Sequence, residues 1–214
     1  FSWAVFHRRV GGTYFALITL ALSLAFETLI ISRQDVTGGF NGLTDFYSIF
    51  GVGLASPGTG SALYWVTLAV LCVAFIALRW LLASRFGILL RASRDGENRV
   101  RFLGYNPTPF KVAAFAIAAM LAGIGGALFT LHAGVVSPAL IGVVPSIEMV
   151  VWVAIGGRYS LAGAIVGALL VNLARDAVSS AFPELWLYLM GALFIFVVTL
   201  LPRGLAGLAK GKAA

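Results

Sequence analysis

The sequence SIEMVVWVAIGG contains two residues whose chemistry is unusual for their surroundings. Glu148 and Trp152 lie four positions apart, so a helix would place both side chains on one face. An acid inside a membrane span costs about 2.5 to 3.5 kcal/mol, and it therefore normally faces a partner or a water-filled path. We predict that Glu148 and Trp152 line a path for a small solute. The alternative is an ion pair between Glu148 and an arginine near the boundary, with Trp152 as an interfacial anchor.

The polar residues of the next apolar run are a second set of candidates. Asn172 could bridge two helices or meet a solute, and we include it among the residues expected to line the path. Arg175 and Asp176 are neighbours at the end of the run and could neutralise one another.

Enzyme motifs are missing from the sequence. It has no GxxxxGK[ST] loop for nucleotide phosphates, no HExxH and no GxSxG. His7 and His132 are far apart, and Cys72 is the single cysteine, so no metal site or disulfide framework is indicated. We expect no enzymatic activity and no cofactor bound by this chain.

Composition identifies the environment of these residues. Hydrophobic residues make up 60% of the 214 and charged residues only 11%, where soluble domains carry about a quarter. The mean hydropathy is +0.98. The net charge of +7 is gathered in short segments between apolar runs, which is typical of membrane loops and not of a nucleic-acid surface. The sequence therefore predicts an integral membrane protein.

The apolar runs predict an all-α protein with about six transmembrane helices, because lipid offers no hydrogen-bond partner to an open backbone. Glycines at positions 163 and 167 form a GxxxG motif, and others lie at 123, 125 and 126; both groups are expected where helices pack closely. The runs that we expect to cross lie at residues 10–26, 61–78, 111–132, 140–157, 160–178 and 185–202.

Basic residues predict the orientation, since cytoplasmic loops are enriched in lysine and arginine. His7, Arg8 and Arg9 precede the first run, and a basic segment follows the second. The basic tail is cytoplasmic only if the run containing Glu148 also crosses, so we expect a short fourth span, kinked near Pro145. The basic residues of the tail are Arg203, Lys210 and Lys212.

The segment RASRDGENRVRFLGYNPTPFK, residues 91–111, is the most charged part of the chain. It is long enough for an amphipathic helix. Pro107 would end this helix, because a proline disfavours the helical conformation of the residue before it. It is either a solvated basic loop or a docking element for a soluble cytoplasmic protein. The apolar side of this helix would consist of Val100, Leu103 and Tyr105, and the polar side of Arg91, Arg94, Asp95, Glu97, Arg99 and Arg101.

These motifs, together with TGGFNGLTDF, SIEMVVWVAIGGRYSLAGAIVGALLVN and LPRGLAGL, resemble the permeases of branched-chain amino acid ATP-binding cassette (ABC) transporters in family order. NGLTDF with Asp45 and Phe46, EMVVWVAIGGR with Arg158, and AFPELW favour the urea branch, with branched-chain amino acids as the alternative substrate. Tyr159 departs from the family pattern. The resemblance implies an ABC importer permease architecture, with this chain, residues 1–214, as the C-terminal part of the transmembrane domain of a longer protein.

The resemblance also implies partners and an inner-membrane location. A second related permease, two ATPase subunits that bind ATP and Mg, and a periplasmic solute-binding protein would complete the importer, and no nucleic acid is involved. Residues 85–110 would be the cytoplasmic coupling segment that contacts an ATPase. Within it, the expected coupling residues are Arg91, Arg94, Glu97, Leu103, Gly104 and Tyr105.

Overall fold

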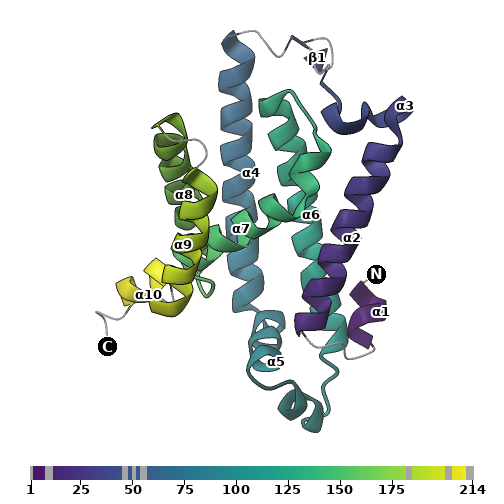
Figure 1. The fold of residues 1–214 in the computed structure, drawn as a ribbon. Coiled ribbons are helices and arrows are strands. Elements are labelled where there is room, and N and C mark those ends of the chain that lie inside the picture. Colours follow the sequence, from purple (N-terminus) through teal and green to yellow (C-terminus); the bar gives the residue numbers. More distant parts are fainter. Residues whose placement is uncertain are drawn as a thin grey trace. The chain divides into compact units, whose positions relative to one another are not determined.

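The computed structural model describes residues 2–7, 12–44, 48–49, 52–53, 57–181, 185–200 and 204–210, and this part of the chain is mainly helical (Figure 1). It divides into two compact units, residues 1–140 and 141–214. Arg8, Arg9, Asp45, Phe46, Arg203 and Lys212 lie outside the described residues.

The first unit is built around three long apolar helices. Its described elements are α1 (Ser2–His7), α2 (Gly12–Ser32), α3 (Gln34–Thr37), η1 (Gly39–Asn41), β1 (Ser48–Ile49), β2 (Val52–Gly53), α4 (Pro57–Ala83), α5 (Arg85–Phe102) and α6 (Thr108–Ala133). The two strands form a small antiparallel ribbon before α4, and α5 connects α4 to α6 at the other end of α4 (Figure 1). Phe15 of α2 packs edge-to-face against Phe115 of α6, with ring centroids 5.5 Å apart.

A backbone contact holds the connection between α2 and α4 against the residues that follow α6. Leu43 and Val136 each donate an N–H to the other's carbonyl, both at 2.9 Å, which makes an isolated antiparallel bridge. Gly42, with φ 73° and ψ −166°, occupies a region essentially reserved for glycine. A Cβ there would overlap the Val136 carbonyl, so only glycine permits this close approach.

The second unit contains α7 (Val143–Gly156), α8 (Leu161–Ala181), α9 (Leu185–Leu200) and α10 (Gly204–Lys210), and η2 (Pro138–Ile141) precedes it. Its small core consists of Val151, Ile155, Val171, Met190 and Val197.

Helices α7 and α8 cross at glycines. A Cβ at Gly156 would overlap the Gly163 carbonyl, and one at Gly167 would lie 2.7 Å from the Gly156 nitrogen. The packing predicted for GxxxG is therefore confirmed. The glycines of α6, at positions 123, 125 and 126, have no atom within 4 Å of an added Cβ, so they do not pack on any described residue.

Four of the described helices are long and apolar enough to cross a membrane: Gly12–Ser32, Gly58–Ala83, Thr108–Ala133 and Leu161–Ser179. The remaining two expected spans correspond to the shorter helices α7 and α9, of 14 and 16 residues. A 14-residue helix rises only about 21 Å, less than the roughly 30 Å of bilayer hydrocarbon. The orientation of the chain therefore stays a prediction.

The prediction of a kink near Pro145 is wrong. Helix α7 begins at Val143 and runs without interruption to Gly156, so Pro145 lies in its first turn. Proline is tolerated there because the first N–H groups of a helix have no partner within the helix.

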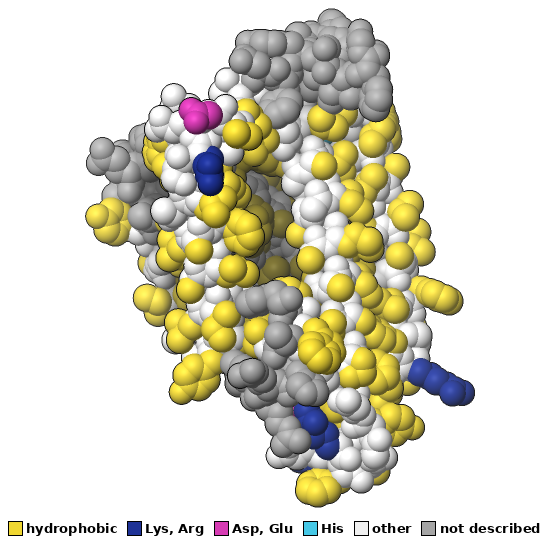
Figure 2. All heavy atoms as spheres, turned by 90° about the vertical axis from the view of Figure 1, so that its right-hand side faces the viewer, with side chains coloured by type: hydrophobic (Ala, Val, Ile, Leu, Met, Phe, Trp, Pro, Cys, Tyr) yellow, Lys and Arg dark blue, Asp and Glu magenta, His cyan; other side chains and the backbone are white. Residues whose placement is uncertain are grey.

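The described surface agrees with a membrane location. Hydrophobic side chains are spread over the described part of the face in Figure 2, with few charged ones among them. Large apolar residues of the three long helices are exposed, including Leu17, Ile76 and Met120. Trp80, near the end of α4, is 78% exposed, in agreement with the enrichment of tryptophan at membrane interfaces.

Candidate functional site

The charged segment forms a helix, as predicted, but the helix is longer and broken. Helix α5 begins at Arg85, after Ser84 in an extended conformation, and ends at Phe102. Gly96 has φ −173° and ψ 83°, which are not helical values. The segment therefore consists of two helical pieces, residues 85–95 and 97–102.

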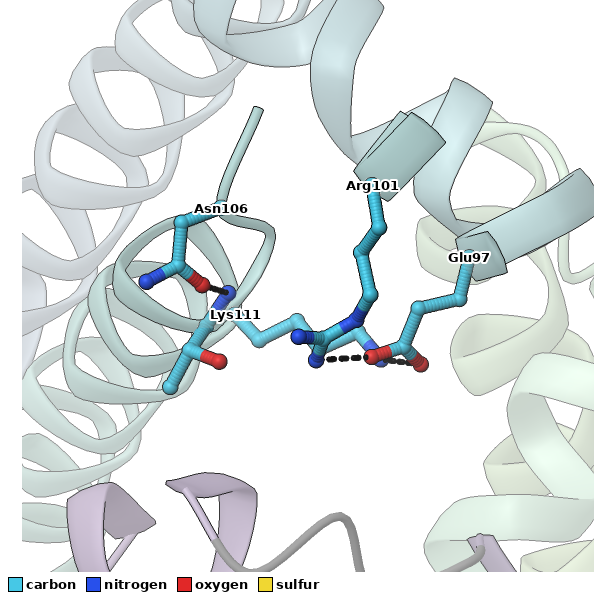
Figure 3. Close-up of polar contacts among 5 residues, drawn as sticks. Glu97, Arg101, Asn106 and Lys111 are labelled. Carbon is cyan, nitrogen blue, oxygen red and sulfur yellow. Dashed lines mark hydrogen bonds and ion pairs between the residues drawn. The ribbon is translucent and has the colours of Figure 1, made fainter. Parts of the chain in front are cut away.

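The end of α5 is a Schellman motif, and this explains the sequence LGYN. Tyr105 donates its N–H to the Val100 carbonyl at 3.2 Å, and Gly104 donates to the Arg101 carbonyl at 2.9 Å. Gly104 has φ 85°, a left-handed conformation that glycine adopts without strain. Asn106 then accepts the N–H of Thr108 at 3.1 Å, which starts α6 (Figure 3). The two helices are thus joined by an ordered turn. Pro107, which was predicted to end α5, instead occupies the N-cap position of α6, since α5 already ends at Phe102.

The expected apolar side of this helix is divided in the structure. Val100 is buried, at 5% exposure, whereas Leu103 is 76% exposed and Tyr105 54%. The prediction that the three form one side is wrong, because the chain reverses after Phe102 and the last two residues leave the helix. Phe102, at 90%, is the most exposed of this group and was not predicted. The signal in the sequence that could have indicated this exposed residue was an aromatic residue directly after Arg101, where the polar side of the helix continues.

Phe102, Leu103 and Tyr105 form the apolar tip of the segment. Three exposed apolar side chains on an ordered turn offer a contact surface whose backbone is already ordered before binding, which lowers the entropic cost of binding. Of the other predicted coupling residues, Gly104 shapes this turn, while Arg94 pairs with Asp95 at 2.9 Å, with both side chains more than half exposed.

Glu97 is the electrostatic centre of the segment. Its carboxylate accepts hydrogen bonds from Arg101, one turn later at 2.8 Å, and from Lys111 in the first part of α6 (Figure 3). The hydrogen bond from Lys111, then that from Arg101, lower the pKa of Glu97, and partial burial opposes them. Glu97 therefore stays ionised to lower pH than an isolated glutamate, and it ties the end of α5 to α6.

The first half of α5 makes its polar and backbone contacts with α4, and its Phe86 ring lies 5.7 Å from the Phe110 ring of α6. Arg91 donates from Nη2 to the Leu82 carbonyl at 3.1 Å. A Cβ at Gly87 would overlap the same carbonyl, so the two backbones are in close contact. Of the predicted coupling residues, Arg91 thus binds α4 and Glu97 binds α6.

Glu148 and Trp152 share one side of α7, as predicted, and this side faces α8 and the core of the second unit. Glu148 is bound to Arg175 of α8 at 3.0 Å, and its side chain is 12% exposed. Trp152 packs against the core cluster. This geometry favours the ion-pair alternative for Glu148, and a role in a solute path stays a prediction.

Two further details concern the polar residues of α8. Asn172 donates its side-chain N–H to the Ala168 carbonyl at 2.8 Å, within its own helix. Among the described residues, Arg175 pairs with Glu148 of α7 and not with the adjacent Asp176. The sequence did not show this pair, because α7 and α8 meet only in the folded chain.

Comparison with known proteins agrees with these features. Residues 2–198 match the family model described as "Branched-chain amino acid transport system / permease component". The chain is 28% identical to the high-affinity branched-chain amino acid transport system permease protein LivM of Salmonella typhimurium, and 27% identical to that of Escherichia coli K12; each match covers 96% of this chain and 56% of the relative. It is 31% identical to LivH of Escherichia coli K12, over 72% of this chain and 49% of the relative.

The chain thus spans about half the length of the curated relatives that it matches. No solved structure matches it.

Proposed function

The chain belongs to the family of permease components of branched-chain amino acid transport systems, and from this premise we propose that it is a permease subunit of an ABC importer for branched-chain amino acids. It is a multi-pass protein of the inner membrane, in agreement with its apolar helices. Its family is one of transport components, and energy would come from ATP and Mg on separate ATPase subunits. A second permease and a solute-binding protein would complete the complex.

The apolar tip of α5 carries this proposal. Phe102, Leu103 and Tyr105 are exposed at the end of a basic segment, and basic segments face the cytoplasm. An apolar cluster displayed on an ordered turn is suited to a cleft on a soluble partner. We therefore assign the tip to the contact with an ATPase subunit.

The solute is the finer part of the proposal. The reported relatives are named for branched-chain amino acids, which supports the alternative reading of the sequence better than urea. Two of the motifs that favoured urea include residues outside the described part, Asp45 and Phe46 in one and residues 182–184 in the other. We keep Glu148, Trp152 and Asn172 as the proposed lining of the path.

The solute is tested on the complete complex, purified with both permeases, both ATPases and the binding protein. Leucine, isoleucine or valine, delivered by the binding protein, should stimulate ATP hydrolysis, and urea should not. Stimulation by urea alone would contradict the assignment of branched-chain amino acids and return the urea reading.

The docking contact is tested with Leu103→Asp. A charge at the centre of an apolar contact should lower uptake by about tenfold or more, since central interface residues are typically worth about 2 kcal/mol. Leu103→Met, which keeps an apolar side chain, is the matched control and should retain uptake. Normal uptake by Leu103→Asp at normal membrane levels would contradict docking at the tip.

A further inference from the structure

The polar links of α5 go to two different spans, one on each side of Gly96, and the Phe86 ring of the first piece also lies 5.7 Å from the Phe110 ring of α6. Before Gly96, the Arg91 guanidinium and the backbone at Gly87 both contact the last turn of α4, at the Leu82 carbonyl. After Gly96, Glu97 binds Lys111 of α6.

The piece after Gly96 is closely joined to α6. Glu97 also binds Arg101, so that one carboxylate fixes both the short helix 97–102 and the first part of α6 (Figure 3). Val100 of this piece is buried. The Schellman turn and the bond from Thr108 to Asn106 leave only Leu103 to Pro107 between the two helices. The apolar tip is therefore expected to move with α6.

The link at Gly96 is weaker, because the helix is interrupted there. Gly96 is in an extended conformation, so the regular α-helical backbone conformation is broken between the two pieces. Short stretches that absorb backbone rotation are the usual positions of hinges.

We propose that Gly96 is a hinge and that Glu97 is a positioning residue, which through Lys111 makes the apolar tip move together with α6 instead of α4. This inference rests on the proposed function, because it assigns the route by which a displacement at the ATPase contact enters the membrane. Movement of the tip is passed to α6 through the carboxylate of Glu97.

A neighbouring ion pair provides a matched control. Asp95 pairs with Arg94, the adjacent residue, and both side chains are exposed. Asp95→Asn removes one carboxylate at a distance of two residues from Glu97 and leaves the bond to α6 intact.

The first measurement tests the link itself. Spin labels are placed at Asn98 and at Met120 of α6, both exposed, in the complete complex with Cys72 replaced. The distance distribution should be narrow in the parent and should broaden in Glu97→Gln and Lys111→Met. Lys111→Arg and Asp95→Asn should keep it narrow. An unchanged distribution in Glu97→Gln would overturn the proposal, whatever the solute or the partner of the tip proves to be.

The second measurement tests the consequence, as solute imported per ATP hydrolysed. Glu97→Gln and Lys111→Met should lower this ratio by about two- to fivefold, the range expected for loss of a partly exposed ion pair, and Lys111→Arg should restore it. A broadened distance with an unchanged ratio would show a structural bond only and would overturn the positioning role. Failure of the proposed function is distinguishable, since it would remove transport from the parent complex as well.

Discussion

The α7–α8 crossing and the α5 segment show two opposite ways of holding helices together. At the crossing, Gly156, Gly163 and Gly167 bring backbone against backbone, with no side chain between them. In the piece of α5 after Gly96, the side-chain link to α6 is made by the ends of long charged side chains, those of Glu97 and Lys111.

The difference has a mechanical meaning. Backbones in direct contact cannot shift without separating, because packed groups are not continuously deformable. A carboxylate bound by two flexible cations can follow a moving partner. We infer that the crossing is a fixed part of the permease and that the piece of α5 after Gly96 is a more adjustable one.

The largest effect is expected from filling the crossing. In Gly167→Ala the new Cβ would overlap the Trp152 carbonyl, so the helices must separate, at a cost of about 1 to 3 kcal/mol or more. Thermal unfolding of the purified protein in detergent would measure the loss.

Gly125→Ala is the matched control, since nothing lies within 4 Å of its Cβ. It should be neutral or stabilise α6 by up to about 1 kcal/mol, the difference in helix propensity between alanine and glycine. Equal destabilisation by the two variants would remove the distinction between the two groups of glycines.

A smaller effect is expected at Glu148, where the crossing itself carries a charged link. Glu148→Gln keeps the shape of the side chain and one acceptor oxygen. If Glu148 lines the solute path, uptake should fall about fivefold in a complex that assembles normally, because the loss of one hydrogen bond costs about 1 kcal/mol. Uptake and yield of the complex are measured together. Poor assembly of both Glu148→Gln and Arg175→Gln would instead support a purely structural pair.

The smallest effect concerns pH and sharpens the description of α5. The pKa of Glu97 is lowered in the folded protein, so its pairing stabilises the fold above the pKa of the unfolded chain and is lost as the pH falls through the folded value. The difference in melting temperature between the parent and Glu97→Gln should be constant from about pH 8 to pH 5 and shrink below about pH 4. Its size should correspond to about 1 kcal/mol or less, because both side chains are partly exposed. A difference that grows on acidification would contradict the pairing.

The sequence alone determined the features that depend on neighbouring residues. Apolar runs indicated the long helices, and the α5 segment was identified by its charge. Pro107 indicated that the helix ends before it, because proline restricts the backbone of the residue that precedes it.

The tertiary structure decided the features that depend on distant residues. The sequence could not show that Val100 turns inward while Leu103 and Tyr105 face outward, since a reversal of the chain separates them. Nor could it choose Glu148 over Asp176 for Arg175, or join Glu97 to Lys111, because those pairs form only when separate helices meet. Likewise, the glycines of α6 and α8 look alike in sequence, and only the neighbours that the fold supplies make one group a crossing and leave the other open.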